Sequence, residues 1–441
     1  MDLKEKIESK KAKVAVIGLG YVGLPQALEI AKAGLSVLGI DLDKDKIESI
    51  QNNKSYINDI KDEDLKFVQE NHDFKVTSDF KKLEDIDVIV ICVPTPLTKN
   101  KTPDVSYIED AGRSIEENFK EGSLVILEST SYPGTTKEVL KPILENGNRE
   151  AGKDFYLSFS PERINPGSKI PLSKITKVIG ALTEKGRELS EAFYKQFIEK
   201  VYPVSSLQAA EMTKILENTY RLINISMINE LALLSGKLDI DIWEVIEAAK
   251  TKPYGFAPFY PSPKVGGHCI PLDPFYLSWK AREKNFWASF IEDAGRINEQ
   301  MPHFIVTQVS TVLNRNKLSF SKSKILVWGV AYKKDIGDAR ESAAIDIIPN
   351  LLRKRAEVDY FDPFVKSLKV SGMYFDKSIE LKSIDYSPEK LKDYDLVLIL
   401  TDHSGFDYEE LAKNANLVVD TRNAIKSRKH SNVSHFGSKS E

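Results

Sequence analysis

The feature that most constrains the fold is a glycine pattern near the N-terminus, Gly18-Leu19-Gly20-Tyr21-Val22-Gly23. It follows a short apolar run at residues 13–17, of the kind buried in parallel sheets, and it opens a helical stretch that extends to about Ala33. The next strand-like run, residues 37–41, ends in the carboxylate of Asp41. A strand, a glycine-rich turn, a helix and a strand that ends in an acid together predict a dinucleotide-binding βαβ unit.

The same residues predict which dinucleotide binds. The glycines allow a tight turn and a close approach of the backbone to a pyrophosphate at the positive end of the following helix. The carboxylate of Asp41 can bind ribose hydroxyls and would repel the 2′-phosphate of NADP, so NAD is the expected cofactor. The alternative is that the glycines serve only the turn. The expected cofactor contacts in this segment are Gly18, Gly20, Tyr21, Val22, Gly23 and Asp41.

Strand-like runs alternate with helical patterns in both halves of the chain. They comprise residues 88–93, 124–128 and 155–159, and then 324–329, 358–361, 396–400 and 417–419. Such alternation predicts an α/β fold with two Rossmann-like, doubly wound parallel-sheet domains.

A long central helix is expected between these two domains. Ser205 and Gln208 match the pattern of a capping box, and the stretch that follows has few strong breakers as far as about Lys237. At about 1.5 Å per residue such a helix is about 45 Å long, enough to join two domains and to present a surface for dimerisation.

Charge and composition exclude several classes of function. The 441 residues carry a formal net charge of −3, so no overall basic field attracts nucleic acid or an anionic membrane, although a local basic pocket can still bind phosphate. No apolar run approaches the length of a membrane span, and the charged N-terminus lacks the apolar core of a signal peptide. With only two cysteines, disulfides are not the basis of the fold, and the cytoplasm is the expected compartment. No group of His, Cys and carboxylate residues has metal-ligand spacing, so no metal is expected.

The two cysteines have different contexts. Cys92 lies within the continuous apolar run 88–93, which indicates a structural role. Cys269 lies in a Gly- and Pro-rich loop four residues before Asp273, where a ligand can reach the thiol. The alternative for Cys269 is a small buried hydrophobe, the usual fate of a free cysteine. His268 is better suited to contact a sugar or to support the site than to act as a general base.

Further polar residues gather on the long helix and after two predicted strands. Glu211, Lys214, Asn218 and Arg221 form one stripe at helical spacing, and the alternative is an ordinary solvated face. Lys214 and Asn218 both donate hydrogen bonds from adjacent turns, which suits a developing oxyanion. Glu128-Ser129-Thr130 and Ser160-Pro161-Glu162-Arg163 follow strands, where open α/β sheets place their ligands, and the alternative is loop polarity.

In combination these motifs resemble the UDP-glucose/GDP-mannose dehydrogenase superfamily from about Lys13 to about Arg422. The series is highly specific, although no single member is. The matching motifs are, in order, Gly18-x-Gly20-Tyr21-Val22-Gly23-Leu24-Pro25, Val93-Pro94-Thr95-Pro96, Ser160-Pro161-Glu162-Arg163, Glu211-Met212-Thr213-Lys214-x-x-Glu217-Asn218, Gly266-Gly267-His268-Cys269 and Tyr332-Lys333-Lys334-Asp335.

The resemblance implies an NAD-dependent oxidation of a sugar C6 alcohol to a carboxylate, with Cys269 as the nucleophile in a thiohemiacetal and then a thioester. The implied catalytic residues are Cys269 as the nucleophile and Lys214 with Asn218, which stabilise the charged oxygen. Asp273 positions or activates water, Glu162 assists thioester hydrolysis, and Thr130 orders a water near the cofactor. The implied additional cofactor contacts are Thr95, Thr130 and Arg340. The implied substrate contacts are Glu162, Arg163, Lys214, Asn218, Tyr260, Gly267, His268, Lys333 and Arg422.

The resemblance also assigns the regions of the chain. Residues 1–204 are expected to form the NAD-binding domain, 205–312 a central helical region for dimerisation and the catalytic loop, 313–430 a UDP-sugar-binding α/β domain, and 431–441 a disordered tail. A homodimer or a dimer-based oligomer is the expected assembly.

The loop before Cys269 indicates the sugar. Residues 252–261 and the run after Cys269 are similar to those of UDP-N-acetylglucosamine 6-dehydrogenases, and the aromatic groups can pack against a 2-acetamido methyl. UDP-N-acetylmannosamine, UDP-N-acetylgalactosamine and UDP-glucose remain alternatives, because one pocket contact can separate epimers. A single-step dehydrogenase without a covalent intermediate, and a non-catalytic NAD-sensing or scaffold protein, are the alternatives of a different kind.

Overall fold

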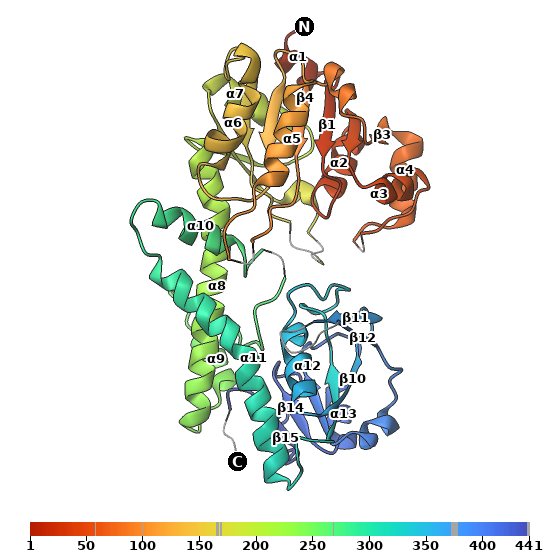
Figure 1. Cartoon of the computed structure of the whole chain (residues 1–441), viewed down its shortest axis with the longest axis vertical. Coiled ribbons are helices and arrows are strands. Elements are labelled where there is room, and N and C mark those ends of the chain that lie inside the picture. Colours follow the sequence, from red (N-terminus) through yellow and green to blue (C-terminus); the bar gives the residue numbers. More distant parts are fainter. Residues whose placement is uncertain are drawn as a thin grey trace. The chain divides into compact units, whose positions relative to one another are not determined.

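The computed structural model describes residues 1–57, 59–98, 100–164, 167, 170–267, 269–371 and 378–438. The chain divides into two compact units, each with its own parallel sheet (Figure 1). The first unit contains residues 1–217 and 275–287, and the second unit contains residues 218–274 and 288–441. The predicted pair of Rossmann-like domains is confirmed.

The first unit is built on an eight-stranded sheet in the order β3-β2-β1-β4-β5-β6-β7-β8. Neighbouring strands are parallel except β6 and β7, which are antiparallel. The strands are β1 (Lys13–Ile17), β2 (Ser36–Ile40), β3 (Phe74–Thr77), β4 (Val88–Ile91), β5 (Leu124–Leu127), β6 (Tyr156–Phe159), β7 (Lys177–Ala181) and β8 (Val201–Pro203).

Both faces of this sheet are covered. Val14 and Val16 of β1 contribute to one apolar cluster, whereas Ala15 and Ile17 contribute to another, because successive side chains of a strand point to opposite faces. A strand buried on both sides reads as a continuous apolar run, which is why β1, β4 and β5 were recognisable. The helices are α1 (Leu3–Glu8), α2 (Gly23–Lys32), α3 (Lys44–Gln51), α4 (Asp62–Asn71), α5 (Ser106–Glu116), α6 (Lys141–Leu144) and α7 (Glu184–Tyr194).

The second unit contains a parallel sheet in the order β10-β9-β13-β14-β15 and a separate antiparallel ribbon, β11-β12. Because β10 and β13 lie on opposite sides of β9, the order in which the chain adds strands to the sheet reverses at β9, which makes this position a topological switch point. The strands are β9 (Lys324–Trp328), β10 (Glu357–Phe361), β11 (Ser367–Val370), β12 (Ile379–Lys382), β13 (Leu396–Ile399), β14 (Val418–Asp420) and β15 (Val433–His435).

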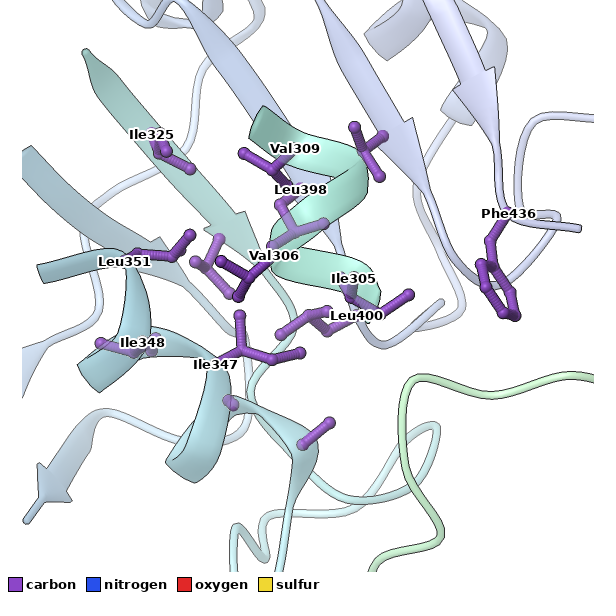
Figure 2. Close-up of a cluster of buried hydrophobic side chains, with 14 of the residues drawn as sticks. Ile305, Val306, Val309, Ile325, Ile347, Ile348, Leu351, Leu398, Leu400 and Phe436 are labelled. Carbon is purple, nitrogen blue, oxygen red and sulfur yellow. The ribbon is translucent and has the colours of Figure 1, made fainter. Parts of the chain in front are cut away.

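Two helices pack on one face of the second sheet. Figure 2 shows aliphatic side chains of α11 and α12 meeting those of β9 and β13 in a buried cluster that includes Ile305, Val306, Val309, Ile325, Ile347, Ile348, Leu351 and Leu398. The remaining helices are α8 (Leu207–Lys237), α9 (Ile242–Lys250), α10 (Asp273–Arg282), α11 (Ser289–Arg315), α12 (Ala343–Arg353) and α13 (Tyr408–Asn414).

The predicted long helix is α8, which has 31 residues and continues from the first unit into the second. Its cap differs from the prediction by one residue. The hydroxyl of Ser206, not Ser205, accepts a hydrogen bond from the backbone N–H of Ala209 at 3.2 Å. Two adjacent serines offer the same capping chemistry, so only the backbone direction distinguishes them. Within the described ranges, no helix is both long and apolar enough to cross a membrane.

The expected disordered tail at residues 431–441 is wrong for its first part. Strand β15 pairs in parallel with β14, and Phe436 is buried in the core of the second unit. The carbonyl oxygen of Phe436 accepts a hydrogen bond from the indole N–H of Trp243 at 2.8 Å. A three-residue polar strand has no apolar period of its own, so the open edge of β14 decides its structure.

Candidate active site

The glycine-rich turn joins β1 to α2 at the carboxyl end of the first sheet. Gly18 has a φ of +88°, and a Cβ there would lie 2.6 Å from the carbonyl oxygen of Cys92. A Cβ on Gly23 would collide with the carbonyl oxygen of Gly18, so α2 can approach the turn only with glycine at this position. In contrast, a Cβ added to Gly20 would meet no described atom within 4 Å. The turn therefore has open space where a pyrophosphate fits.

Asp41 lies directly after β2 and holds this turn in place. Its Oδ2 accepts a hydrogen bond from the backbone N–H of Leu19 at 2.8 Å, and its Oδ1 accepts one from the N–H of Asp43 at 2.9 Å. The ammonium of Lys46 lies 3.1 Å from Oδ2. Asp41 thus combines a structural contact to the glycine turn with a negative charge beside it.

The carboxyl ends of β1, β4, β5 and β6 lie along one edge, because these neighbouring strands are parallel. Thr95 follows β4 and Thr130 follows β5, and both are half-buried. The hydroxyl of Ser129 donates a hydrogen bond to the carbonyl of Val93 at 2.8 Å and so joins the two loops. Thr95 and Thr130 therefore lie at the edge where such sheets bind nucleotides.

Lys214 and Glu162 meet in the interior of the first unit. The ammonium of Lys214 donates a hydrogen bond to the backbone carbonyl of Glu162, and both side chains are buried. Burial raises the pKa of the Glu162 carboxyl; Lys177 acts in the opposite direction, and Glu128 adds to the increase. A raised pKa makes it easier for this carboxyl to take up a proton, as a general base must.

The polar stripe of α8 is not a solvated face. Glu211, Lys214 and Asn218 are all buried, and only Arg221 is exposed. The alternative of a solvated stripe is therefore wrong for three of its four members. Buried polar groups require partners, so each of the three has a specific role in the interior.

Glu211 has a structural role within this stripe. Its carboxylate accepts hydrogen bonds from the N–H of Gly134 at 2.5 Å and from the N–H and hydroxyl of Thr136 at 2.9 and 2.6 Å. These contacts fix the beginning of the π-helical segment Thr136–Leu140 against α8. Both carboxylate oxygens of Glu211 thus accept hydrogen bonds from protein groups, which supports a structural role.

In the second unit, Cys269 is exposed, so the alternative of a buried hydrophobe is wrong. Its carbonyl oxygen accepts a hydrogen bond from the N–H of Asp273 at 2.8 Å, at the start of α10. The carboxylate of Asp273 is buried, and its Oδ2 accepts a hydrogen bond from the Asn218 side chain at 2.5 Å. Cys92, in contrast, is buried, and burial raises the pKa of its thiol well above the usual value.

The glycines before Cys269 allow its loop to pack closely on a neighbouring segment of the second unit. A Cβ on Gly266 would lie 2.7 Å from the carbonyl oxygen of Glu341, and one on Gly267 would lie 2.8 Å from the ring of Tyr332. The cysteine loop therefore lies against the Tyr332-Lys333-Lys334 motif. His268 falls outside the described residues.

A basic pocket lies at the carboxyl ends of β9, β13 and β14 in the second unit. The residues that line it include Tyr332, Thr401 and four cations, namely Lys264, Lys333, Lys334 and Arg422. Asp402 lies 3.2 Å from the Arg422 guanidinium and 3.9 Å from the Lys334 ammonium. This pocket lies at the switch point next to β9, and its cations are suited to a diphosphate.

A buried pair fixes the loop that carries Lys333 and Lys334. Asp362 accepts hydrogen bonds from the N–H groups of Val330 and Ala331 at 2.7 and 2.9 Å, and the ring of His403 lies 3.0 Å from the same carboxylate. Burial opposes the ionisation of Asp362, but the hydrogen bonds from His403 and from backbone N–H groups hold its pKa below the usual value. A fixed backbone presents the lysines to the pocket with little loss of entropy.

The other predicted ligand residues have protein partners. These pairs are Arg163 with Glu217 at 2.7 Å, Arg340 with Asp338 at 2.6 Å, and the Tyr260 hydroxyl with Glu247 at 2.7 Å. Tyr21 is exposed and Val22 is half-buried beside the glycine turn. The roles of these residues in ligand binding stay predictions.

Three lysines were missed from the sequence. Lys177 is buried beside Glu162, and Lys264 and Lys334 line the basic pocket. A lysine within the strand Lys177–Ala181, which is otherwise apolar, was the available signal for the first. The motif Tyr332-Lys333-Lys334-Asp335 was the signal for Lys334, whereas no sequence pattern joins Lys264 to that motif.

Comparison with known families matches the chain in three consecutive segments. Residues 12–198 match the NAD binding domain of the UDP-glucose/GDP-mannose dehydrogenase family, residues 208–300 its central domain, and residues 326–427 its UDP binding domain. The glycine turn falls in the first segment and the Cys269 loop in the second. The residues that line the basic pocket fall in the third, except Pro263 and Lys264, which fall in the second.

Two curated relatives span nearly the same length. The chain is 34% identical to the UDP-N-acetyl-D-glucosamine 6-dehydrogenase of Salmonella typhi over 90% of this chain and 91% of that one. It is 36% identical to the UDP-N-acetyl-D-mannosamine dehydrogenase of Pyrococcus horikoshii over 94% of this chain and 96% of that one. A solved structure of the UDP-D-ManNAc dehydrogenase from P. horikoshii superimposes with a TM-score of 0.87, at 33% identity and with 96% and 99% of the two chains covered. The chain therefore belongs to the UDP-glucose/GDP-mannose dehydrogenase family and is an NAD-dependent nucleotide-sugar dehydrogenase.

Proposed function

We propose that this enzyme oxidises C6 of UDP-N-acetylglucosamine from an alcohol to a carboxylate in two successive hydride transfers. UDP-N-acetylmannosamine, UDP-N-acetylgalactosamine and UDP-glucose are the alternative substrates for the same chemistry. One observation carries the proposal: the exposed thiol of Cys269 begins a turn that ends at the buried carboxylate of Asp273, which Asn218 holds at 2.5 Å. A reachable thiol and an oriented carboxylate thus belong to the two ends of one backbone turn, which supports the proposal.

The reaction balances as two oxidations, one addition and one hydrolysis. Removal of a hydride from C6 and a proton from its hydroxyl gives a 6-aldehyde. The sulfur of Cys269 attacks the aldehyde carbon, and the thiol proton passes to the oxygen, which gives a thiohemiacetal. Loss of a second hydride and of the hydroxyl proton gives a thioester, and water cleaves its C–S bond to restore the thiol and release the carboxylate. When bound, NAD would supply the hydride acceptor for each oxidation.

The buried polar residues supply the other roles. Lys214 and Asn218, one turn apart on α8, donate hydrogen bonds to the oxygen that carries negative charge after sulfur attack. Asp273 positions the attacking water, and Glu162 assists hydrolysis by taking up a proton, as its raised pKa favours. Thr130 orders a water beside the cofactor.

Two nucleotide-binding sites are proposed. NAD is assigned to the glycine turn with Asp41, Thr95 and Arg340, and the open space at Gly20 fits its pyrophosphate. The UDP group is assigned to the basic pocket, where Lys333 and Arg422 face a cavity at a sheet switch point. Arg163, Tyr260, Gly267 and His268 are assigned to the sugar side, as the motif match implies.

We propose a homodimer in which the exposed apolar side chains of α8 pack against a second copy of the chain. Met227, Leu231 and Leu234 of this helix, at spacings of four and three, are exposed, as is Leu238 directly after its last residue. Exposed apolar residues at such spacing form a stripe of the kind that packs against another helix.

The substrate is tested by the NADH yield on a panel of nucleotide sugars. We expect two NADH per sugar with UDP-N-acetylglucosamine and a lower kcat/KM with its manno and galacto epimers and with UDP-glucose. The two curated relatives are named for the gluco and manno epimers, so both belong on the panel. A yield of one NADH per sugar would favour a single-step dehydrogenase. A higher kcat/KM with UDP-N-acetylmannosamine would make that sugar the substrate in place of UDP-N-acetylglucosamine.

Asp41→Ala is expected to reduce the preference for NAD over NADP by about tenfold or more, because the carboxylate no longer repels the 2′-phosphate. The kcat/KM values with NAD and NADP measure this ratio. The loss of the contact to Leu19 N–H also weakens NAD binding itself. Asp45→Ala removes the same charge from an exposed site in the first turn of α3 and serves as the control. An unchanged ratio in Asp41→Ala would contradict the assignment.

A further inference from the structure

Three buried ionisable side chains meet beneath the carboxyl edge of the first sheet. Glu128 follows β5, Glu162 follows β6 and Lys177 begins β7, and these side chains are 1%, 6% and 3% exposed. The ammonium of Lys177 lies 2.7 Å from Glu128 Oε2 and 3.8 Å from Glu162 Oε2. One buried cation is therefore shared unequally between two carboxylates.

Both carboxylate oxygens of Glu128 accept hydrogen bonds from buried side chains. Besides Lys177, it accepts hydrogen bonds from the side-chain amide of Gln26 at 2.6 Å and from the hydroxyl of Tyr194. Charged hydrogen bonds of this kind are the strong ones in a protein interior. Glu128 and Lys177 thus form a hydrogen-bonded ion pair in the core.

Only one carboxylate oxygen of Glu162 accepts a hydrogen bond within the described residues. Its Oε1 accepts a hydrogen bond from the N–H of Ile164, whereas its Oε2 has no hydrogen-bond donor in the described part of the chain. The charged and titratable groups that face it are Lys177 of β7, Glu128 after β5, Lys214 of α8 and the thiol of Cys92 after β4. Lys214 gives one hydrogen bond to the carbonyl of the same residue. The unsatisfied oxygen is the one that faces Lys177.

We propose that the Glu128–Lys177 pair controls the protonation of Glu162. Glu128 neutralises most of the charge of Lys177, so Glu162 can gain and lose a proton during thioester hydrolysis. This inference rests on the proposed role of Glu162 in that step. Neither Glu128 nor Lys177 touches the reacting atoms, so both act through Glu162.

The geometry predicts opposite effects of removing the two partners. Without the Glu128 charge, the whole charge of Lys177 acts on Glu162 and stabilises its ionised form, so its pKa falls. Without Lys177, Glu162 faces a second buried carboxyl and no nearby compensating ammonium on that side, so its pKa rises further. A purely structural network would lower activity in both variants without opposite shifts.

The test compares Glu128→Gln with Lys177→Met. The pH midpoint of the rising limb of kcat, which reports ionisation of the base, is expected to move by about 1–3 pH units towards acid in Glu128→Gln and towards alkali in Lys177→Met. Lys177→Arg retains the charge and is expected to restore most of the wild-type midpoint.

Lys120→Met is the matched control. Lys120 lies 2.8 Å from Asp87 at the amino-terminal edge of the same sheet, so the control removes a lysine from an ion pair at the opposite edge. Its midpoint is expected to equal that of the wild type. Equal shifts in both test variants, or none in either, would overturn the inference.

A second measurement does not depend on turnover. The infrared band of a protonated carboxyl that disappears in Glu162→Gln reports the charge of Glu162 directly in the full-length protein, and its midpoint is expected to shift in the same opposite directions. If no nucleotide sugar is oxidised, the proposed function falls while this titration still tests the inference. If Lys177→Met does not fold, Glu128→Gln alone decides, because an unchanged band midpoint there contradicts the proposal.

Discussion

Cys269→Ala is expected to reduce kcat for carboxylate formation by at least about a thousandfold and to lower the NADH yield from two per sugar to no more than one. Without the sulfur, the aldehyde cannot form the thiohemiacetal, whose oxygen drives the departure of the second hydride from C6. The first oxidation does not need the thiol, so a single turnover with trapped aldehyde remains. Rapid-mixing measurement of NADH together with trapping of the aldehyde checks both parts.

The other cysteine provides the matched control for this experiment. Cys92→Ala removes a buried thiol from the interior of the first unit and is expected to cost about 1–2 kcal/mol of unfolding free energy while the yield of two NADH is retained. Wild-type rates in Cys269→Ala would remove the covalent mechanism, because no other exposed cysteine exists in this chain.

Lys214→Met is expected to lower kcat by roughly 10²–10³-fold with a smaller change in KM, because it removes a preorganised donor from the oxygen that becomes charged only during the reaction. The side chain is buried, so solvent cannot replace the lost donor. Methionine retains most of the volume, which limits the effect on packing. Steady-state kinetics of the purified variant measures kcat and KM separately.

Lys237→Met is the control on the same helix. Lys237 is the exposed last residue of α8, and its replacement is expected to leave both constants unchanged. The Lys214 ammonium also anchors the carbonyl of Glu162, so thermal unfolding is measured in parallel. A decrease in kcat of less than about tenfold in Lys214→Met would contradict the assigned role.

Much of the fold was predictable because its strands are buried on both faces. The predicted runs 88–93, 124–128 and 324–329 each contain at least four consecutive apolar residues, and they overlap β4, β5 and β9. The glycine turn was predictable for a related reason, because Gly18 and Gly23 encode close backbone packing directly, and Gly20 leaves open space between them. Local sequence is sufficient wherever one segment satisfies its own steric and hydrophobic needs.

Features that depend on a distant partner were missed or displaced. Strand β15 is polar and gains its structure from the edge of β14, and Ser206 rather than Ser205 caps α8 because of the direction in which the chain enters the helix. The stripe of Glu211, Lys214 and Asn218 has the spacing of a solvated helix face, yet all three are buried. Spacing predicts which residues share a face, but not whether that face meets water.

The amino-acid sequence by itself determined the two βαβ frameworks, the NAD-binding turn, the long helix and the identity of the chemical groups, since each of these follows from local periodicity or from a motif. Only the tertiary structure decided which of those groups are paired. It separated the exposed Cys269 from the buried Cys92, gathered Lys264, Lys334 and Arg422 in one pocket, and placed Lys177 between two carboxylates. The physical reason is that burial and electrostatic partnership depend on distances across the fold, and sequence separation does not encode these distances.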